Sequence, residues 1–346
     1  MITVRVPLGE RSYDVLVGHG VRAEVAGLLP ATTRRAAIVT QHGVPLDIDP
    51  GVPFEVFTIG SGEGHKSLAT IEDLCRGFAR FGLTRNDVVI GVGGAMVTDV
   101  AGFAAASWHR GVPVVHVATT LVGMVDAAIG GKTGVNISAG DGVAGDVGGK
   151  NLIGAYWQPS GVVCDLDALA TLPPREVRCG RGEMAKYHFL TGDELLAMDE
   201  TERIARCVAI KAEIVAGDER ESGRRALLNY GHTLAHALEI ATDYSLAHGE
   251  AVAVGLIYAA HLARNLGRID DRRVEQHYEV VGGSYELETT LPAGLDPEQL
   301  IGLMARDKKA LGAGLTFVLD SRDGVEVVSG VPVDAARASL DTMMQR

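Results

Sequence analysis

The chain has 346 residues, 47% of them hydrophobic, so it is long enough for two domains and can bury a substantial core. Its formal net charge of −12 argues against nucleic acid and anionic membranes as partners, while leaving an anionic small substrate open. Four widely spaced cysteines, the lack of a signal-peptide core and the lack of an apolar run of roughly 18 residues predict a cytoplasmic protein with reduced thiols.

Strand and helix patterns alternate through the first half of the chain. Residues 2–7 and 13–18 predict a hairpin, apolar runs predict strands at 35–40, 54–59, 88–94 and 113–117, and helical spacing marks 67–81, 96–108 and a run ending at 128. The order of strand, glycine turn, helix and strand is typical of a parallel α/β sheet that binds nucleotides at its carboxyl edge. We therefore predict a nucleotide-binding α/β domain over residues 1–175.

The pattern changes after residue 175, where Pro173-Pro174 introduces a helical series that continues through residue 306. Strand signals return only at 315–319 and 325–328. We predict a mainly α-helical, metal-binding domain over residues 176–346, with a cleft between the two domains.

Three histidines lie within seventeen residues of the helical half, at His232, His236 and His248. The spacing of four residues puts His232 and His236 on one face of a helix, and His248 follows after a short turn. Two or three imidazoles with a carboxylate can hold a catalytic zinc ion and leave one coordination position open. Packed or solvated histidines are the alternative, and the HExxH motif of zinc peptidases is absent.

Four further segments are rich in glycine or charge. The turn at residues 91–94 precedes a helix, where backbone amides suit a pyrophosphate, and residues 61–66 carry Glu63 and Lys66 before another helix. The glycine-rich segment 130–150 has lysines at Lys132 and Lys150, and Glu183 lies three residues before Lys186 on one helical face. Taken singly, these segments also fit a capped turn, a surface connection and a surface ion pair.

Together the motifs resemble the 3-dehydroquinate synthase family. They are residues 93–99, 108–112, 125–126, 130–136, 149–151, 182–187, 210–212, 225–236, 248–250 and 307–309, in that order over nearly the whole chain. The resemblance implies a homodimeric, NAD-dependent lyase with zinc or cobalt that converts 3-deoxy-D-arabino-heptulosonate 7-phosphate to 3-dehydroquinate and phosphate, a shikimate-pathway step. The implied route is transient oxidation by NAD, β-elimination of phosphate, re-reduction and intramolecular aldol closure.

The resemblance also assigns residues. It implies metal ligands at Glu183, His232 and His248, and makes His236 a substrate contact where helical spacing alone favoured it as a ligand. The other implied substrate contacts are Asp126, Lys132, Asn151, Lys186, Lys211, Arg225, Asn229 and one of Lys308 and Lys309, with Arg110 reaching the partner subunit's site. The implied NAD contacts are Glu63, Lys66, Gly93, Gly94, Ala95, Val97, Asp99, Thr119, Thr120, Lys132 and Lys150.

The chain departs from the family pattern in three places. Thirteen residues, 137–149, replace the usual few beside the expected phosphate end, and Ser61 and Ala118 replace an aspartate and a proline near the expected NAD contacts. The alternatives are another sugar-phosphate cyclase, a metal-dependent polyol dehydrogenase or a non-catalytic homologue. The many lysines argue against the dehydrogenase, because a neutral polyol gives them nothing to bind.

Overall fold

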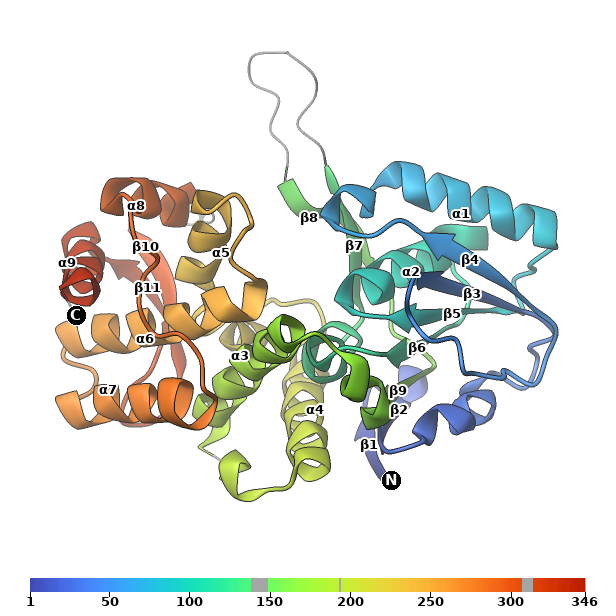
Figure 1. Ribbon diagram of the computed structural model, residues 1–346, viewed down its shortest axis with the longest axis horizontal. Helices are drawn as coiled ribbons and strands as arrows, with labels where there is room; N and C mark the ends of the chain where they lie inside the picture. Colours follow the sequence, from blue (N-terminus) through green and yellow to red (C-terminus); the bar gives the residue numbers. More distant parts are fainter. Residues whose placement is uncertain (138–148, 193, 307–313, 346) are drawn as a thin grey trace, which may run out of the picture. The chain divides into compact units, whose positions relative to one another are not determined.

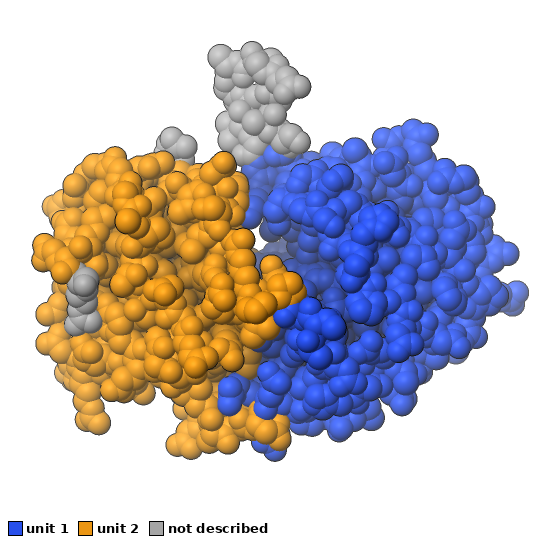
Figure 2. Space-filling model, in the orientation of Figure 1, with its two compact units in different colours: residues 1–172, 200–220 blue, residues 173–199, 221–346 orange. Residues whose placement is uncertain are grey.

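Figure 1 shows a computed structural model of the chain, which describes residues 1–137, 149–192, 194–306 and 314–345. The chain forms two compact units, coloured separately in Figure 2: unit 1 is Met1–Leu172 with Glu200–Arg220, and unit 2 is Pro173–Asp199 with Glu221–Arg346. The expected domains, 1–175 and 176–346, differ in that α4 (Glu200–Gly217) returns to unit 1. It does so because its apolar side, which includes Ile204 and Val208, packs against β1 and β2. None of the described helices is long and apolar enough to cross a membrane.

Unit 1 is built on a seven-stranded sheet with the order β1-β2-β9-β6-β5-β3-β4. Its strands are β1 (Ile2–Val6), β2 (Tyr13–Gly18), β3 (Ala36–Gln41), β4 (Phe54–Ile59), β5 (Val88–Gly93), β6 (Val114–Ala118) and β9 (Gly161–Asp165). All neighbours pair in parallel except β1, which forms an antiparallel hairpin with β2 at one edge. The predicted parallel α/β sheet is therefore confirmed.

Both faces of this sheet are covered, which explains why β5 is buried along its whole length. Helices α1 (Leu68–Phe81) and α2 (Ala95–Ser107) pack on one face, where Val89 contributes to the core. The turn η2 (Val21–Leu28) covers the other face, where Ile90 contributes. A separate hairpin of β7 (Lys132–Ile137) and β8 (Gly149–Tyr156) packs on α2.

Unit 2 is mainly helical, as predicted, and packs around α6 (His248–Asn265). Most of α6 is buried because α3 (Pro174–Thr191), α5 (His232–Ala241), α7 (Asp271–Tyr278) and α9 (Val333–Met344) all pack on it (Figure 1). The unit also contains α8 (Pro297–Arg306) and a two-stranded sheet of β10 (Leu315–Leu319) and β11 (Glu326–Val331).

Short 3₁₀ or π turns connect these elements. They are η1 (Gly9–Arg11), η3 (Glu63–His65), η4 (Trp108–Arg110), η5 (Gly123–Ala127), η6 (Leu166–Thr171), η7 (Leu195–Ala197), η8 (Arg224–Asn229) and η9 (Glu279–Ser284). The predicted helical run ending at residue 128 is helical over residues 121–127, of which Gly123–Ala127 form the π turn η5.

Candidate active site

Backbone contacts at glycines set α3 and α5 against α6. A Cβ atom on Gly182 would lie 2.0 Å from the carbonyl oxygen of Gly249, and one on Gly249 would lie 1.7 Å from that of Cys179. A Cβ atom on Gly255 would lie 2.0 Å from the carbonyl oxygen of Gly231, which itself has a φ of +80°. Only glycine allows such close helix contact and this backbone conformation. The residues that follow Gly182 and Gly231, and the one that precedes Gly249, are the three predicted metal ligands.

Those three residues, Glu183, His232 and His248, meet at one point of unit 2. One ligand atom from each lies within 4.8 Å of the other two. The Nε2 atoms of His232 and His248 lie 3.4 and 3.0 Å from Oε1 of Glu183, whose side chain is fully buried. One carboxylate and two imidazoles are the donor set of many catalytic zinc sites, so these residues fit a divalent cation.

The Nδ1 atom of each histidine ligand, which points away from Glu183, also has a hydrogen-bond partner. Nδ1 of His232 lies 3.0 Å from the carbonyl oxygen of Tyr230, and Nδ1 of His248 lies 3.3 Å from Oε2 of Glu239. A carbonyl can only accept, so Nδ1 of His232 donates to it. Such outer partners orient metal-binding histidines. Sequence reasoning missed Glu239, although its position two helical turns after His232 puts both on one face of α5.

The charges at this point favour a cation. Lys186 Nζ lies 2.5 Å from Oε2 of Glu183, and both side chains are buried. Burial opposes ionisation of Glu183, but the charges of Lys186 and His232 and the hydrogen bonds from the histidines lower its pKa well below the usual value. Burial lowers the pKa of His232. Burial also acts against protonation of His248, but its hydrogen bonds to Glu183 and Glu239 raise its pKa to about 10. The site therefore holds positive charge between two carboxylates.

Three of the predicted substrate contacts of the helical half lie in the same unit: His236, Arg225 and Asn229. The His236 ring centroid is 5.6 Å from that of His232 and 6.4 Å from that of His248, so His236 is a neighbour of the cluster. Among the described residues, the group of possible metal ligands contains His232 and His248 but not His236. Arg225 is 1% exposed, and Asn229 Nδ2 donates to Oε1 of Glu221 at 2.9 Å.

The turn from β5 into α2 is shaped for close approach of a ligand. A Cβ atom on Gly93 would lie 2.5 Å from Val97, and one on Gly94 would lie 2.8 Å from Thr120, so neither position has room for a side chain. The amide of Thr119 donates to the carbonyl of Gly93, which holds the end of β6 beside this turn. Ala95 begins α2 here, and amides at a helix N-terminus suit a pyrophosphate. This part of unit 1 fits a dinucleotide.

Glu63, Lys66 and Asp99 gather beside the turn. Lys66 Nζ lies 2.5 Å from Asp99 Oδ2, and burial raises the pKa of Asp99. Asn136 Nδ2 donates to Glu63 Oε2 at 2.7 Å, the Asn136 amide donates to the Lys66 carbonyl, and Asn136 Oδ1 accepts from the Asn151 amide at 3.0 Å. Asn136, which the sequence assigned no role, thus connects two predicted NAD contacts with a predicted substrate contact.

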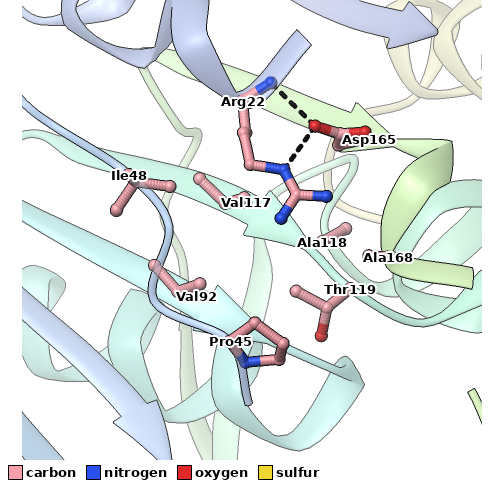
Figure 3. A pocket seen from close by; sticks show the side chains of 9 residues that line it. All are labelled: Arg22, Pro45, Ile48, Val92, Val117, Ala118, Thr119, Asp165 and Ala168. Atoms are coloured by element: carbon pink, nitrogen blue, oxygen red, sulfur yellow. Dashed lines mark hydrogen bonds and ion pairs between the residues drawn. The ribbon is translucent and has the colours of Figure 1, made fainter. Parts of the chain in front are cut away.

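A small apolar pocket lies at the carboxyl ends of β5, β6 and β9 (Figure 3). Its wall includes Val92, Val117 and an ion pair in which Arg22 Nε donates to Asp165 Oδ2 at 2.6 Å. Ligands of open parallel sheets bind outside this edge. Sequence reasoning did not identify Arg22 or Asp165 because they are 143 residues apart and belong to no local motif.

The other predicted substrate contacts of unit 1 are placed on η4, η5, α4, β7 and β8. Lys211 Nζ on α4 binds both Oδ1 of Asp126, at 2.5 Å, and its carbonyl oxygen, at 2.6 Å. Lys132 is exposed at the start of β7, and Arg110 is exposed on η4 with a φ of 68°. Lys150 and Asn151 are on β8. The predicted contacts Lys308 and Lys309, and most of the segment 137–149, lie outside the described residues.

Comparison with known proteins identifies the family. Residues 56–179 match the family described as 3-dehydroquinate synthase N-terminal, and residues 180–310 match 3-dehydroquinate synthase C-terminal. The chain is 52% identical to a putative aminodehydroquinate synthase of Amycolatopsis mediterranei, covering 99% of this chain and 94% of that protein. It is 40% identical to a 3-dehydroquinate synthase of Symbiobacterium thermophilum, covering 97% and 99%. The solved 2-epi-5-epi-valiolone synthase of Streptomyces hygroscopicus, with NAD+ and Zn2+ bound, aligns with a TM-score of 0.81 and 26% identity over 96% of this chain and 97% of that one. The chain belongs to the 3-dehydroquinate synthase family.

Proposed function

We propose that the protein is a metal- and NAD-dependent sugar-phosphate cyclase that converts 3-deoxy-D-arabino-heptulosonate 7-phosphate to 3-dehydroquinate and phosphate. The observation that carries this proposal is the cluster of Glu183, His232 and His248 in a chain with 3-dehydroquinate synthase relatives. A solved relative that binds NAD+ and Zn2+ supports zinc as the metal, with cobalt as the alternative. A cytoplasmic location remains a prediction.

The chain's own residues bind and orient an anionic substrate in this reaction. When bound, NAD would supply a reversible hydride acceptor, and a metal held by Glu183, His232 and His248 would supply a Lewis acid. Arg225 can grip a carboxylate or phosphate with two parallel hydrogen bonds, whereas Lys186 and Lys211 act as point charges. A neutral polyol offers no anionic group for Arg225 to bind in this way, which argues against the polyol dehydrogenase alternative.

A second candidate differs in the substrate. The identity of 52% to the putative aminodehydroquinate synthase exceeds the 40% to the 3-dehydroquinate synthase, over nearly the whole chain in both cases. This difference favours an amino-substituted heptulosonate phosphate, which would give aminodehydroquinate by the same route. The metal cluster and the glycine turn suit both substrates equally. The two candidate substrates must therefore be distinguished by assaying them side by side.

The test is incubation of the purified protein with each heptulosonate phosphate, a trace of NAD and Zn2+ or Co2+. The proposal expects one phosphate released per cyclic product and no accumulation of NADH, because the hydride returns to the substrate. Stoichiometric NADH, or no phosphate from either substrate, would exclude a phosphate-eliminating cyclase. The larger kcat/KM identifies the physiological substrate, and a preference for the amino compound would overturn the first candidate in favour of the second.

We also propose a homodimer in which the exposed Arg110 completes the partner's site. A 1:1 mixture of Arg110→Ala and Glu183→Gln subunits forms, on random pairing, about half mixed dimers, each with one intact site. The mixture should then regain about a quarter of the wild-type activity, although each variant alone is inactive. A mixture as inactive as its components would refute the exchange of Arg110.

A further inference from the structure

The orientation of His232 depends on the main-chain carbonyl of Tyr230, as its Nδ1 contact shows. Tyr230 lies between η8 and α5, outside the bounds of both helices. Its side chain is fully buried, and its hydroxyl lies 2.8 Å from Nε2 of His277 on α7. The side chain of Tyr230 therefore anchors the residue whose carbonyl holds His232.

His277 is a fixed acceptor for this hydroxyl. Its Nδ1 lies 2.8 Å from the carbonyl of Arg273 and must donate to it, which leaves Nε2 to accept from Tyr230. Burial lowers the pKa of His277 to about 4, so the ring is neutral at neutral pH. Asp320 Oδ2 is 3.9 Å from Nε2, beyond hydrogen-bond distance, and is bound by Arg273 Nε at 2.6 Å.

The same histidine ring reaches the helix that carries Glu183. His277 stacks on Phe189 with ring centroids 3.9 Å apart and an angle of 2° between the planes. Phe189 lies six residues after Glu183 on α3, and its ring also meets the edge of Tyr230 at 6.3 Å. His277 thus contacts both the helix of one predicted ligand and the residue that orients another.

We propose that Tyr230 and His277 are positioning residues for the metal site, which together set His232 relative to Glu183. The inference rests on the proposed metal and adds to it two residues that touch neither metal nor substrate. Outer partners of metal ligands typically change metal affinity by about 10- to 100-fold. Because the Tyr230 hydroxyl acts through one further bond, we expect the lower end of that range.

The test replaces one buried hydroxyl at a time. Tyr230→Phe keeps the ring and removes the hydrogen bond to His277. Tyr258→Phe is the matched control, because Tyr258 is equally buried in the same unit and its hydroxyl donates to the carbonyl of Ala336 at 3.0 Å. Affinity for Zn2+ and Co2+ is measured by competition with a chelator, together with the Co2+ absorption spectrum and the Tm of the metal-free protein.

We expect Tyr230→Phe to weaken metal binding about tenfold and to change the Co2+ spectrum, and Tyr258→Phe to stay within about twofold at a similar loss of Tm. His277→Phe keeps an aromatic ring to stack on Phe189 and should weaken binding to the same degree. The double variant of Tyr230 and His277 should be no weaker than either single one, because both changes break one hydrogen bond.

Wild-type affinity in Tyr230→Phe would overturn the inference, as would equal weakening in the Tyr258 control. Additive losses of metal affinity in the double variant would also refute the idea that Tyr230 and His277 act through one hydrogen bond. If the wild-type protein itself binds no divalent metal, the proposed function fails together with this inference. If the wild type binds metal and Tyr230→Phe binds it equally well, only the positioning role fails.

Discussion

The contact between α3 and α6 makes Gly249→Ala a sharp test of how the metal cluster is held. The added Cβ atom would lie 1.7 Å from the carbonyl oxygen of Cys179, whereas ordinary van der Waals contact begins near 3.4 Å. Because the obstacle is a backbone atom, the helices must separate by about 1.7 Å along this direction. His248 lies one residue before Gly249 on α6, and Glu183 lies one helical turn after Cys179 on α3, so the separation acts on their 3.0 Å approach.

The magnitude follows from two comparisons. Overpacking a close-packed core costs about 1–3 kcal/mol, and a clash with fixed backbone should reach the upper end of that range. The gain of up to about 1 kcal/mol from replacing a helical glycine by alanine offsets only part of it. Metal–ligand distances tolerate deviations of about 0.2 Å, far less than the displacement required. We therefore expect net destabilisation by about 2 kcal/mol and a loss of metal affinity of about 100-fold.

The assay is guanidinium unfolding with chelator competition, and α8 offers the control. Gly302→Ala lies in a helix of the same unit and its Cβ atom would meet nothing within 4 Å. It should stabilise the protein by about 0.5–1 kcal/mol and leave metal affinity unchanged. A Gly249→Ala protein with wild-type metal affinity would show that the glycine contact does not position the ligands.

Three further predictions rest on single side chains. Glu183→Gln removes the anionic ligand and the negative charge beside the buried Lys186, so metal retention and phosphate release should fall together; full activity with retained metal would remove Glu183 from the site. Glu239→Gln keeps the size of the side chain but removes its charge beside His248, and should weaken metal binding about tenfold in chelator competition, while an unchanged affinity would make Glu239 a core residue only. Stability should fall as pH drops from 6.5 towards 4, because burial lowers the pKa of His116 and of His277 to about 4 and the unfolded chain then binds more protons. Between pH 7.5 and 5.5 each histidine should remove about 1.3 kcal/mol from the free energy of unfolding, and His116→Asn should remove its share of that slope; a pH-independent unfolding midpoint over this range would contradict the assignment.

Local sequence determined the elements and most of the chemistry. Apolar runs such as 88–94 specify buried strands, and glycines at Gly93 and Gly94 mark the turn before α2, because strand and helix periods are properties of a few neighbouring residues. Family motifs then indicated Glu183, His232 and His248, and the structure places their ligand atoms together.

Tertiary structure decided which of these residues meet and what supports them. Helical spacing paired His232 with His236, but packing of α5 and α3 on α6 pairs it with His248, since ligand geometry follows the crossing of three helices and not the period of one. Three other features join residues that no local pattern connects. They are the packing of α4 in unit 1, the contact of the Glu239 carboxylate with His248, and the hydrogen bond between Tyr230 and His277. Contacts of this kind form only when the whole core packs, so they could not be predicted from the sequence.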